Sequence, residues 1–160
     1  MTNTGETVTL LTWRDVDRAF DRLIDLAETT IDVAERDLAL TGWEGKERSA
    51  RLEQAMGERN VRIRIVLVDL THVERHLARL THLLRSHGTL LTVLEAARPS
   101  DVSQACTVVD GRHGLVRPDL VRSTGRLWVS NPYKSRPYRE FFEHIWELGG
   151  RRFFPEAHGL

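Results

Sequence analysis

Alternating and helical hydrophobic patterns divide the chain into short regular segments. Segment 61–69 first alternates arginine with isoleucine and then becomes continuously apolar, which is typical of a central strand covered on both faces. Segment 14–28 places Val16, Phe20, Leu23 and Ile24 at helical spacing. The expected strands are 7–13, 30–37, 61–69, 89–96, 105–110, a hairpin strand within 114–118, and 126–130. The expected helices are 14–28, 44–58, 71–87 and 136–147.

Several helix ends carry local signals. Thr12 stands three residues before Asp15, which resembles a capping box at the start of the first helix. Gly57 and Gly88 are expected to end the second and third helices. The last helix carries the most hydrophobic stripe of the chain, and this stripe is expected to lie in the core.

The order of these segments predicts the fold class. Strands alternate with helices, and an antiparallel strand group and a final helix follow. This order predicts an α/β sandwich with a mixed, largely parallel sheet flanked by helices. No internal repeat or linker interrupts the pattern, so one domain is expected over 7–150. Residues 1–6 are polar and expected to be disordered, and 151–160 form a C-terminal tail.

Composition narrows the possible functions. The chain has 160 residues with 23 basic and 23 acidic side chains, so no overall positive field favours nucleic acid as a partner. Cys106 is the only cysteine, which excludes an intrachain disulfide and a cysteine-based zinc site and fits the reducing cytoplasm as the expected location. The N-terminus lacks the features of a signal peptide, and no apolar run approaches about 18 residues, so no membrane span is predicted.

The C-terminal third reads CTVVDGRHGLVRP and later LWVSNPYKSRPYREFFEHIWE. With LIDLAETTIDVAERDL and VRIRIVLVD before it, the chain resembles a phospholipase D-like (PLD) half-domain from about Thr7 to Glu147, most closely short bacterial members. The family's active site is built from two halves. The resemblance therefore implies pairing with a second copy or with another PLD-like chain. Phe153 and Phe154, beyond the last helix, either contact such a partner or fold back on the domain.

The family's catalytic segment reads H-x-K, four residues, D, and later G-S/G-x-N. Aligning Asp110 with the motif aspartate puts Ser103 and Ala105 where the histidine and lysine belong. Asn131 then matches the motif asparagine, with Trp-Val in place of Gly-Ser before it. In the family the histidine attacks phosphorus and the lysine stabilises negative charge. Serine without an adjacent base is a weak nucleophile and alanine supplies no charge, so phosphodiesterase activity is not expected.

The leading hypothesis is therefore a non-catalytic binding or regulatory protein. The loops around the motif aspartate and asparagine are expected to surround the former catalytic pocket and to bind a small phosphorylated ligand. No cofactor or metal is predicted. The proposed ligand-binding residues are Asp110, Arg112, Arg117, Asn131 and Lys134.

Three alternatives remain open. His113 follows the turn after Asp110, and with that carboxylate as its orienting group it would give a rearranged phosphodiesterase or nuclease. A purely structural interaction protein would have its former pocket filled by side chains such as Trp128. His72 and His76 are four residues apart on a predicted helix and thus point the same way, but they lack the zinc-protease pattern, so an exposed helix face is expected.

Overall fold

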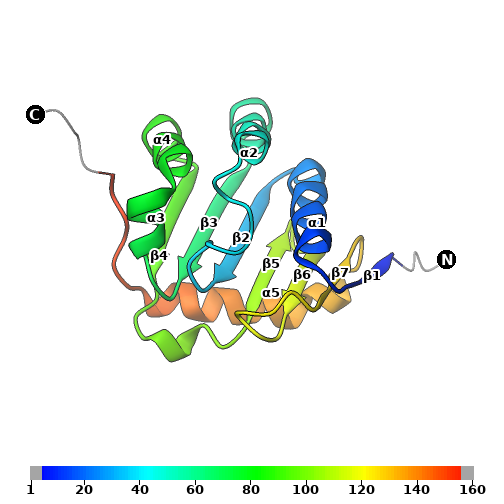
Figure 1. Ribbon diagram of the computed structural model, residues 1–160. Coiled ribbons are helices and arrows are strands. Elements are labelled where there is room, and N and C mark those ends of the chain that lie inside the picture. The colour runs from blue at the N-terminus through cyan, green and yellow to red at the C-terminus, as the bar shows by residue number, and fades with distance from the viewer. Residues whose placement is uncertain (1–4, 156–160) are drawn as a thin grey trace, which may run out of the picture.

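The computed structural model describes residues 5–155, which form one seven-stranded sheet with helices on both faces (Figure 1). The strands are β1 (Thr7–Leu10), β2 (Thr30–Glu35), β3 (Arg62–Leu67), β4 (Leu91–Glu95), β5 (Ala105–Val109), β6 (His113–Arg117) and β7 (Gly125–Trp128). The helices are α1 (Trp13–Leu26), α2 (Lys46–Arg59), α3 (Thr71–His76), α4 (Ala78–Ser86) and α5 (Pro132–Leu148), with a 3₁₀ turn η1 (Pro99–Asp101). The predicted α/β class is confirmed.

The sheet is mixed, as predicted, with strand order β1-β7-β6-β5-β2-β3-β4. Strands β2, β3 and β4 are parallel, whereas the other four strand pairings described are antiparallel. The expectation of a largely parallel sheet was therefore wrong. Only residues 110–112 connect β5 to β6. Such a short connection can join antiparallel neighbours but not parallel ones.

Helices α1 to α4 cover one face of the sheet and α5 alone crosses the other (Figure 1). Because side chains alternate along a strand, Val33 belongs to the core under α1 and the next residue, Ala34, to the core under α5. Within residues 5–155 no helix is long and apolar enough to cross a membrane.

Helix α5 is held on the sheet by a charged cluster. Arg64 of β3 donates two hydrogen bonds to Asp32 of β2, at 2.9 and 3.0 Å, and also pairs with Glu143 of α5. Its guanidinium lies 5.0 Å from the ring centre of Phe142 and 5.1 Å from that of Trp146. The predicted aromatic stripe thus packs on the sheet around a paired arginine.

Of the helix boundaries that differ from the sequence prediction, three bear on the fold. Gly57 does not end α2, which continues to Arg59 and ends at Asn60, a residue in the left-handed conformation at φ +55°. The long helix expected after β3 breaks at Leu77 into α3 and α4. Helix α5 begins earlier than expected, because the Asn131 side chain accepts a hydrogen bond from the N–H of Lys134 at 3.0 Å and caps the first turn.

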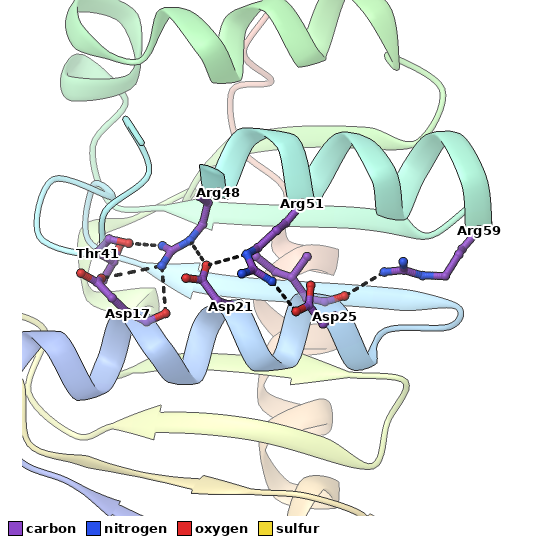
Figure 2. A network of polar contacts seen from close by, with 8 residues as sticks. Asp17, Asp21, Asp25, Thr41, Arg48, Arg51 and Arg59 are labelled. Carbon is purple, nitrogen blue, oxygen red and sulfur yellow. Dashed lines mark hydrogen bonds and ion pairs between the residues drawn. The ribbon is translucent and has the colours of Figure 1, made fainter. Parts of the chain in front are cut away.

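Ion pairs join α2 to α1. Arg48, only 5% exposed, donates to the carboxylate of Asp21 at 2.9 Å and to the carbonyl of Asp17 at 3.1 Å. The charge-rich α2 therefore contacts its neighbour through charges as well as through its narrow apolar stripe. Figure 2 shows the aspartates of α1 beside the arginines of α2: Asp17, Asp21 and Asp25 with Arg48, Arg51 and Arg59.

The segment after α5 folds back on the domain. The N–H of Glu95 donates to the carbonyl of Arg151 at 2.8 Å, and the N–H of Phe153 donates to the carbonyl of Val93 at 2.8 Å. Phe153 is buried in the core under α1 to α4, whereas Phe154 is 66% exposed. This segment therefore covers the β4 edge of the sheet.

Candidate functional site

The residues aligned with H-x-K lie at the end of the sheet where β2 ends and β5 begins. Ala105, the lysine position, pairs across the sheet with Arg117, the last residue of β6. Ser103, the histidine position, is exposed just before β5. Glu35 ends β2 one residue beyond Ala34, which pairs with Cys106. Ala105, Glu35 and Arg117 therefore meet at one end of three neighbouring strands.

The Arg117 side chain is buried at this end of the sheet. It is 1% exposed, and its guanidinium forms an ion pair with Glu35, which is 3% exposed. It also donates to three carbonyl oxygens of residues 119–122, the nearest being that of Arg122 at 2.7 Å. The ring centre of Trp13 lies 4.9 Å from the guanidinium carbon. The cation beside the lysine position is thus neutralised and enclosed by the protein.

Burial controls the ionisation of the groups around Arg117. It raises the pKa of Glu35, although the charge and hydrogen bond of Arg117 act in the opposite direction. It also raises the pKa of the Cys106 thiol far above neutrality, and the nearby Glu35 and Asp32 carboxylates add to this effect. Cys106 is therefore a buried, protonated thiol and not a nucleophile.

Asp110 lies at the opposite end of β5 and joins two loops. Its carboxylate accepts hydrogen bonds from the N–H groups of Glu28, Thr29 and Thr30 at 2.9, 2.8 and 3.0 Å, and from the Thr29 hydroxyl at 2.9 Å. Burial alone would raise the pKa of Asp110, but these hydrogen bonds outweigh it and the pKa is lowered. Through these hydrogen bonds, Asp110 links the β5–β6 turn to the backbone at the start of β2.

His113 is buried, and its Nδ1 accepts a hydrogen bond from the N–H of Ser130 at 2.9 Å. Burial lowers the pKa of His113, the Arg112 charge adds to this, and the Asp110 charge opposes it. The ring is thus neutral at pH 7 with Nδ1 as an acceptor. A catalytic triad needs Nδ1–H donating to a carboxylate, so Asp110 does not orient His113 in that way.

Asn131 joins the β5–β6 turn to α5. Its N–H donates to the carbonyl of Arg112 at 2.7 Å, and its side chain caps the helix at Lys134. The Lys134 ammonium lies 6.0 Å from the ring centre of Trp128. Among residues 5–155, no carboxylate pairs with Arg112 or Lys134.

The predicted ligand set therefore divides between two places. Asp110, Arg112, Asn131 and Lys134 gather at one end of β6, and Arg117 lies at the other, about 13 Å away along the strand. The five residues therefore do not surround one pocket, contrary to the expectation. The two ends of a β-strand lie on opposite sides of the fold. The H-x-K positions lie at the start of β5, whereas the turn at residues 110–112 follows its other end.

Trp128 does not lie beside the aligned H-x-K positions either, because it pairs with Gly114 near the opposite end of β6 from Arg117. It is completely buried under α5, its indole N–H donates to the Ser135 hydroxyl at 2.7 Å, and its ring stacks on Tyr138 at 5.1 Å. The large side chain beside the aligned lysine position is that of Arg117. The sequence analysis did not identify Glu35 and Trp13 as contacts of Arg117. A glutamate at the end of an otherwise buried strand could have indicated a buried ion pair.

His72 and His76 lie together on α3, with ring centres 5.1 Å apart. In the part of the chain that the structure describes, no group of three or more histidine, cysteine or acidic residues is arranged to hold a metal ion. The pair therefore has no third protein ligand of these types beside it.

Residues 12–152 match the protein family described as a domain of unknown function, DUF7931. The chain belongs to this family. No curated protein matches its sequence. Since the match begins at the cap of α1 and ends in the segment that pairs with β4, the family spans nearly all of the fold.

Solved structures show that this DUF7931 member has the PLD-like fold. The phospholipase D family member Nuc from Salmonella typhimurium matches with TM-score 0.67 and 13% identity, over 94% of this chain and 99% of Nuc. NucT from Helicobacter pylori matches with TM-score 0.66 and 9% identity, over 92% and 99%. TrmBL2, an archaeal chromatin protein described with a novel mode of DNA binding, matches with TM-score 0.67 and 12% identity. That match covers 93% of this chain but only 54% of TrmBL2.

Proposed function

We propose that this protein is a non-catalytic PLD-like binding or regulatory protein. The observation that carries the proposal is the buried pair of Arg117 and Glu35 beside Ala105. An active PLD-type site needs a nucleophile and a free cation that can meet a phosphoryl group. Here Ser103 has replaced the nucleophile, and the cation beside the lysine position is paired and enclosed.

The proposed ligand is a small phosphorylated molecule, bound at the start of α5 by Arg112 and Lys134. Two features support this place. Both side chains lack a carboxylate partner among the residues described, and the N-terminus of a 17-residue helix adds positive potential. Asp110 and Asn131 would act as positioning residues, because they hold the turn and the helix start together.

Two parallel assays test the proposal. Hydrolysis of bis-(p-nitrophenyl) phosphate is expected to be absent, and thermal unfolding is expected to shift upward with inorganic pyrophosphate. The double variant R112A/K134A should lose the shift. The control R136A should keep it, because Arg136 lies on the same helix but pairs with Glu140.

The outcomes separate the two parts of the proposal. Turnover that disappears in H113A would overturn the non-catalytic assignment and make His113 part of a rearranged site. A pyrophosphate shift that survives R112A/K134A would refute only the ligand position. Absence of both turnover and shift would favour a structural interaction protein.

Pairing with a second PLD-like chain remains part of the proposal. Phe153 no longer supports it, because this ring packs in its own core, whereas Phe154 is exposed. Sedimentation equilibrium is expected to show a dimer that F154S weakens. A monomer at all concentrations would refute self-pairing.

A further inference from the structure

Among residues 5–155, no segment pairs with the outer side of β1, whereas residues 151–153 pair with β4. Antiparallel pairing alternates residues that bond to the neighbour with residues that point away. The carbonyl of Glu6 accepts from the N–H of Val129 at 2.9 Å, so Val8 and Leu10 also face β7. The N–H and C=O groups of Thr7 and Thr9 therefore point outward, and both residues are exposed. The four-residue strand therefore offers the outward N–H and C=O groups of two residues for pairing.

A cavity flanks this edge on each face of the sheet, and both cavities are lined by Thr9 and Leu10. The cavity on the α1 side has a volume of about 210 Å³ and is also lined by Val8, Ala19 and Arg18. The cavity on the α5 side has a volume of about 390 Å³, and its further lining includes Val116, Tyr138 and Arg126. A strand added beside β1 would direct alternate side chains to the two faces and thus toward both cavities.

The charges around the edge favour an acidic occupant. Within residues 5–155, neither Arg18 on the α1 side nor Arg126 on the α5 side forms an ion pair, although the charge of Arg18 acts on the nearby Asp15 carboxylate. The two carboxylates nearby are engaged: Glu6 pairs with Arg22 at 2.7 Å, and Asp15 accepts the N–H groups of residues 11 and 12. An incoming carboxylate on either face would therefore meet a guanidinium that no close ion pair holds.

The same charges disfavour a second copy as the occupant. Two copies joined antiparallel through β1 would be related by a twofold axis near Thr9. This symmetry would bring Arg18 of each copy toward its counterpart, and likewise Arg126. Like charges facing one another across an interface oppose association.

We propose that β1 is a docking site for an extended acidic segment of a partner protein, which adds to the sheet as an eighth strand. Its backbone would pair with Thr7 and Thr9, its apolar side chains would enter the two cavities, and its carboxylates would meet Arg18 and Arg126. This inference does not depend on the anion site at the start of α5.

Fluorescence anisotropy with two labelled peptides tests the proposal. The acidic probe is Thr-Val-Val-Glu-Glu-Val-Val-Thr, whose adjacent glutamates would fall on opposite faces of the added strand. The control probe carries lysines in place of the glutamates. The acidic probe should bind at least about tenfold more tightly, since two exposed ion pairs form in one complex and two repulsions in the other. The double variant R18E/R126E should reverse the preference.

Backbone pairing is tested at Thr9. T9P removes an outward N–H without removing a bond to β7, and proline is tolerated on edge strands. It should abolish binding of the acidic probe, whereas T9V, which keeps the N–H, should bind as the unaltered protein does. Thermal unfolding of each variant checks that it is folded. If T9P does not fold, the reversal by R18E/R126E decides the matter.

Three results would overturn the inference. Equal affinity for the two probes would refute recognition of an acidic segment by Arg18 and Arg126. Binding that is unaffected in a folded T9P variant would refute backbone pairing with β1. A dimer in sedimentation equilibrium that T9P dissociates would identify a second copy as the occupant.

Discussion

Replacing Arg117 by methionine should strongly destabilise the fold. Methionine keeps most of the volume but removes the ion pair to Glu35 and three hydrogen bonds to loop carbonyls. Removing one partner of a buried pair typically costs about 3–5 kcal/mol, because the other charge remains without compensation. A single domain has about 5–15 kcal/mol in total, so R117M should lose a large fraction of its free energy of unfolding.

The loss should depend on pH in a definite direction. Burial raises the pKa of Glu35, so the folded protein holds this proton to a higher pH than the unfolded chain does. For such a group the stabilising contribution is present at low pH and is lost as pH rises through the folded pKa. Without Arg117, the main influence that lowers the pKa of Glu35 is gone. The difference in stability between the unaltered protein and R117M should therefore be smallest in acid and widen toward pH 8.

Urea unfolding followed by tryptophan fluorescence measures this, since Trp13 contacts Arg117 directly. The double variant E35Q/R117M should be more stable than R117M alone at pH 8 by roughly 2 kcal/mol, because the buried charge is gone. A loss below about 1 kcal/mol in R117M, or strictly additive effects in the double variant, would show that the pair is not a coupled buried ion pair.

Three further changes test other contacts. D110N keeps the shape but weakens four hydrogen bonds, so it should cost about 2–3 kcal/mol at pH 7 by urea unfolding. Since the pKa of Asp110 is lowered, that cost should fade as pH drops through the folded pKa. G114A would bring a methyl within 2.3 Å of the Trp128 ring, and thermal unfolding should show about 2 kcal/mol of lost stability. A105K places a lysine at the position aligned with the PLD-motif lysine but buries it beside Arg117, so calorimetry should show a lower Tm and phosphodiesterase assays no gain.

The sequence alone was sufficient for most of the fold because its strongest patterns report burial directly. Segment 61–69 alternates and then becomes apolar, and β3 indeed has its first residue exposed and its last three buried. The end of α2 was missed because Gly57 suggested a stop, whereas Asn60 supplies the left-handed residue. A stop depends on backbone conformation, which glycine permits but does not require.

The site was less predictable because its contacts join residues far apart in the chain. Glu35 and Arg117 are 82 positions apart, and only the strand register brings them together. Asp110 bonds mostly to backbone N–H groups, and any residue except proline could supply these. The sequence could be compared with the H-x-K motif, but it could not show which side chains surround the aligned positions.

Both edges of the sheet have a consequence for synthesis on the ribosome. β1 pairs with β7, and residues 151–153 pair with β4. Neither β1 nor the outer side of β4 can therefore form its backbone pairing before the C-terminal third of the sequence has been synthesised. The nascent chain therefore carries unpaired strand edges until residues 125–153 have been synthesised. Such edges invite association with other chains. Slow translation of residues 125–153, or truncation of the chain after α5, should thus lead to aggregation rather than to a folded shorter domain.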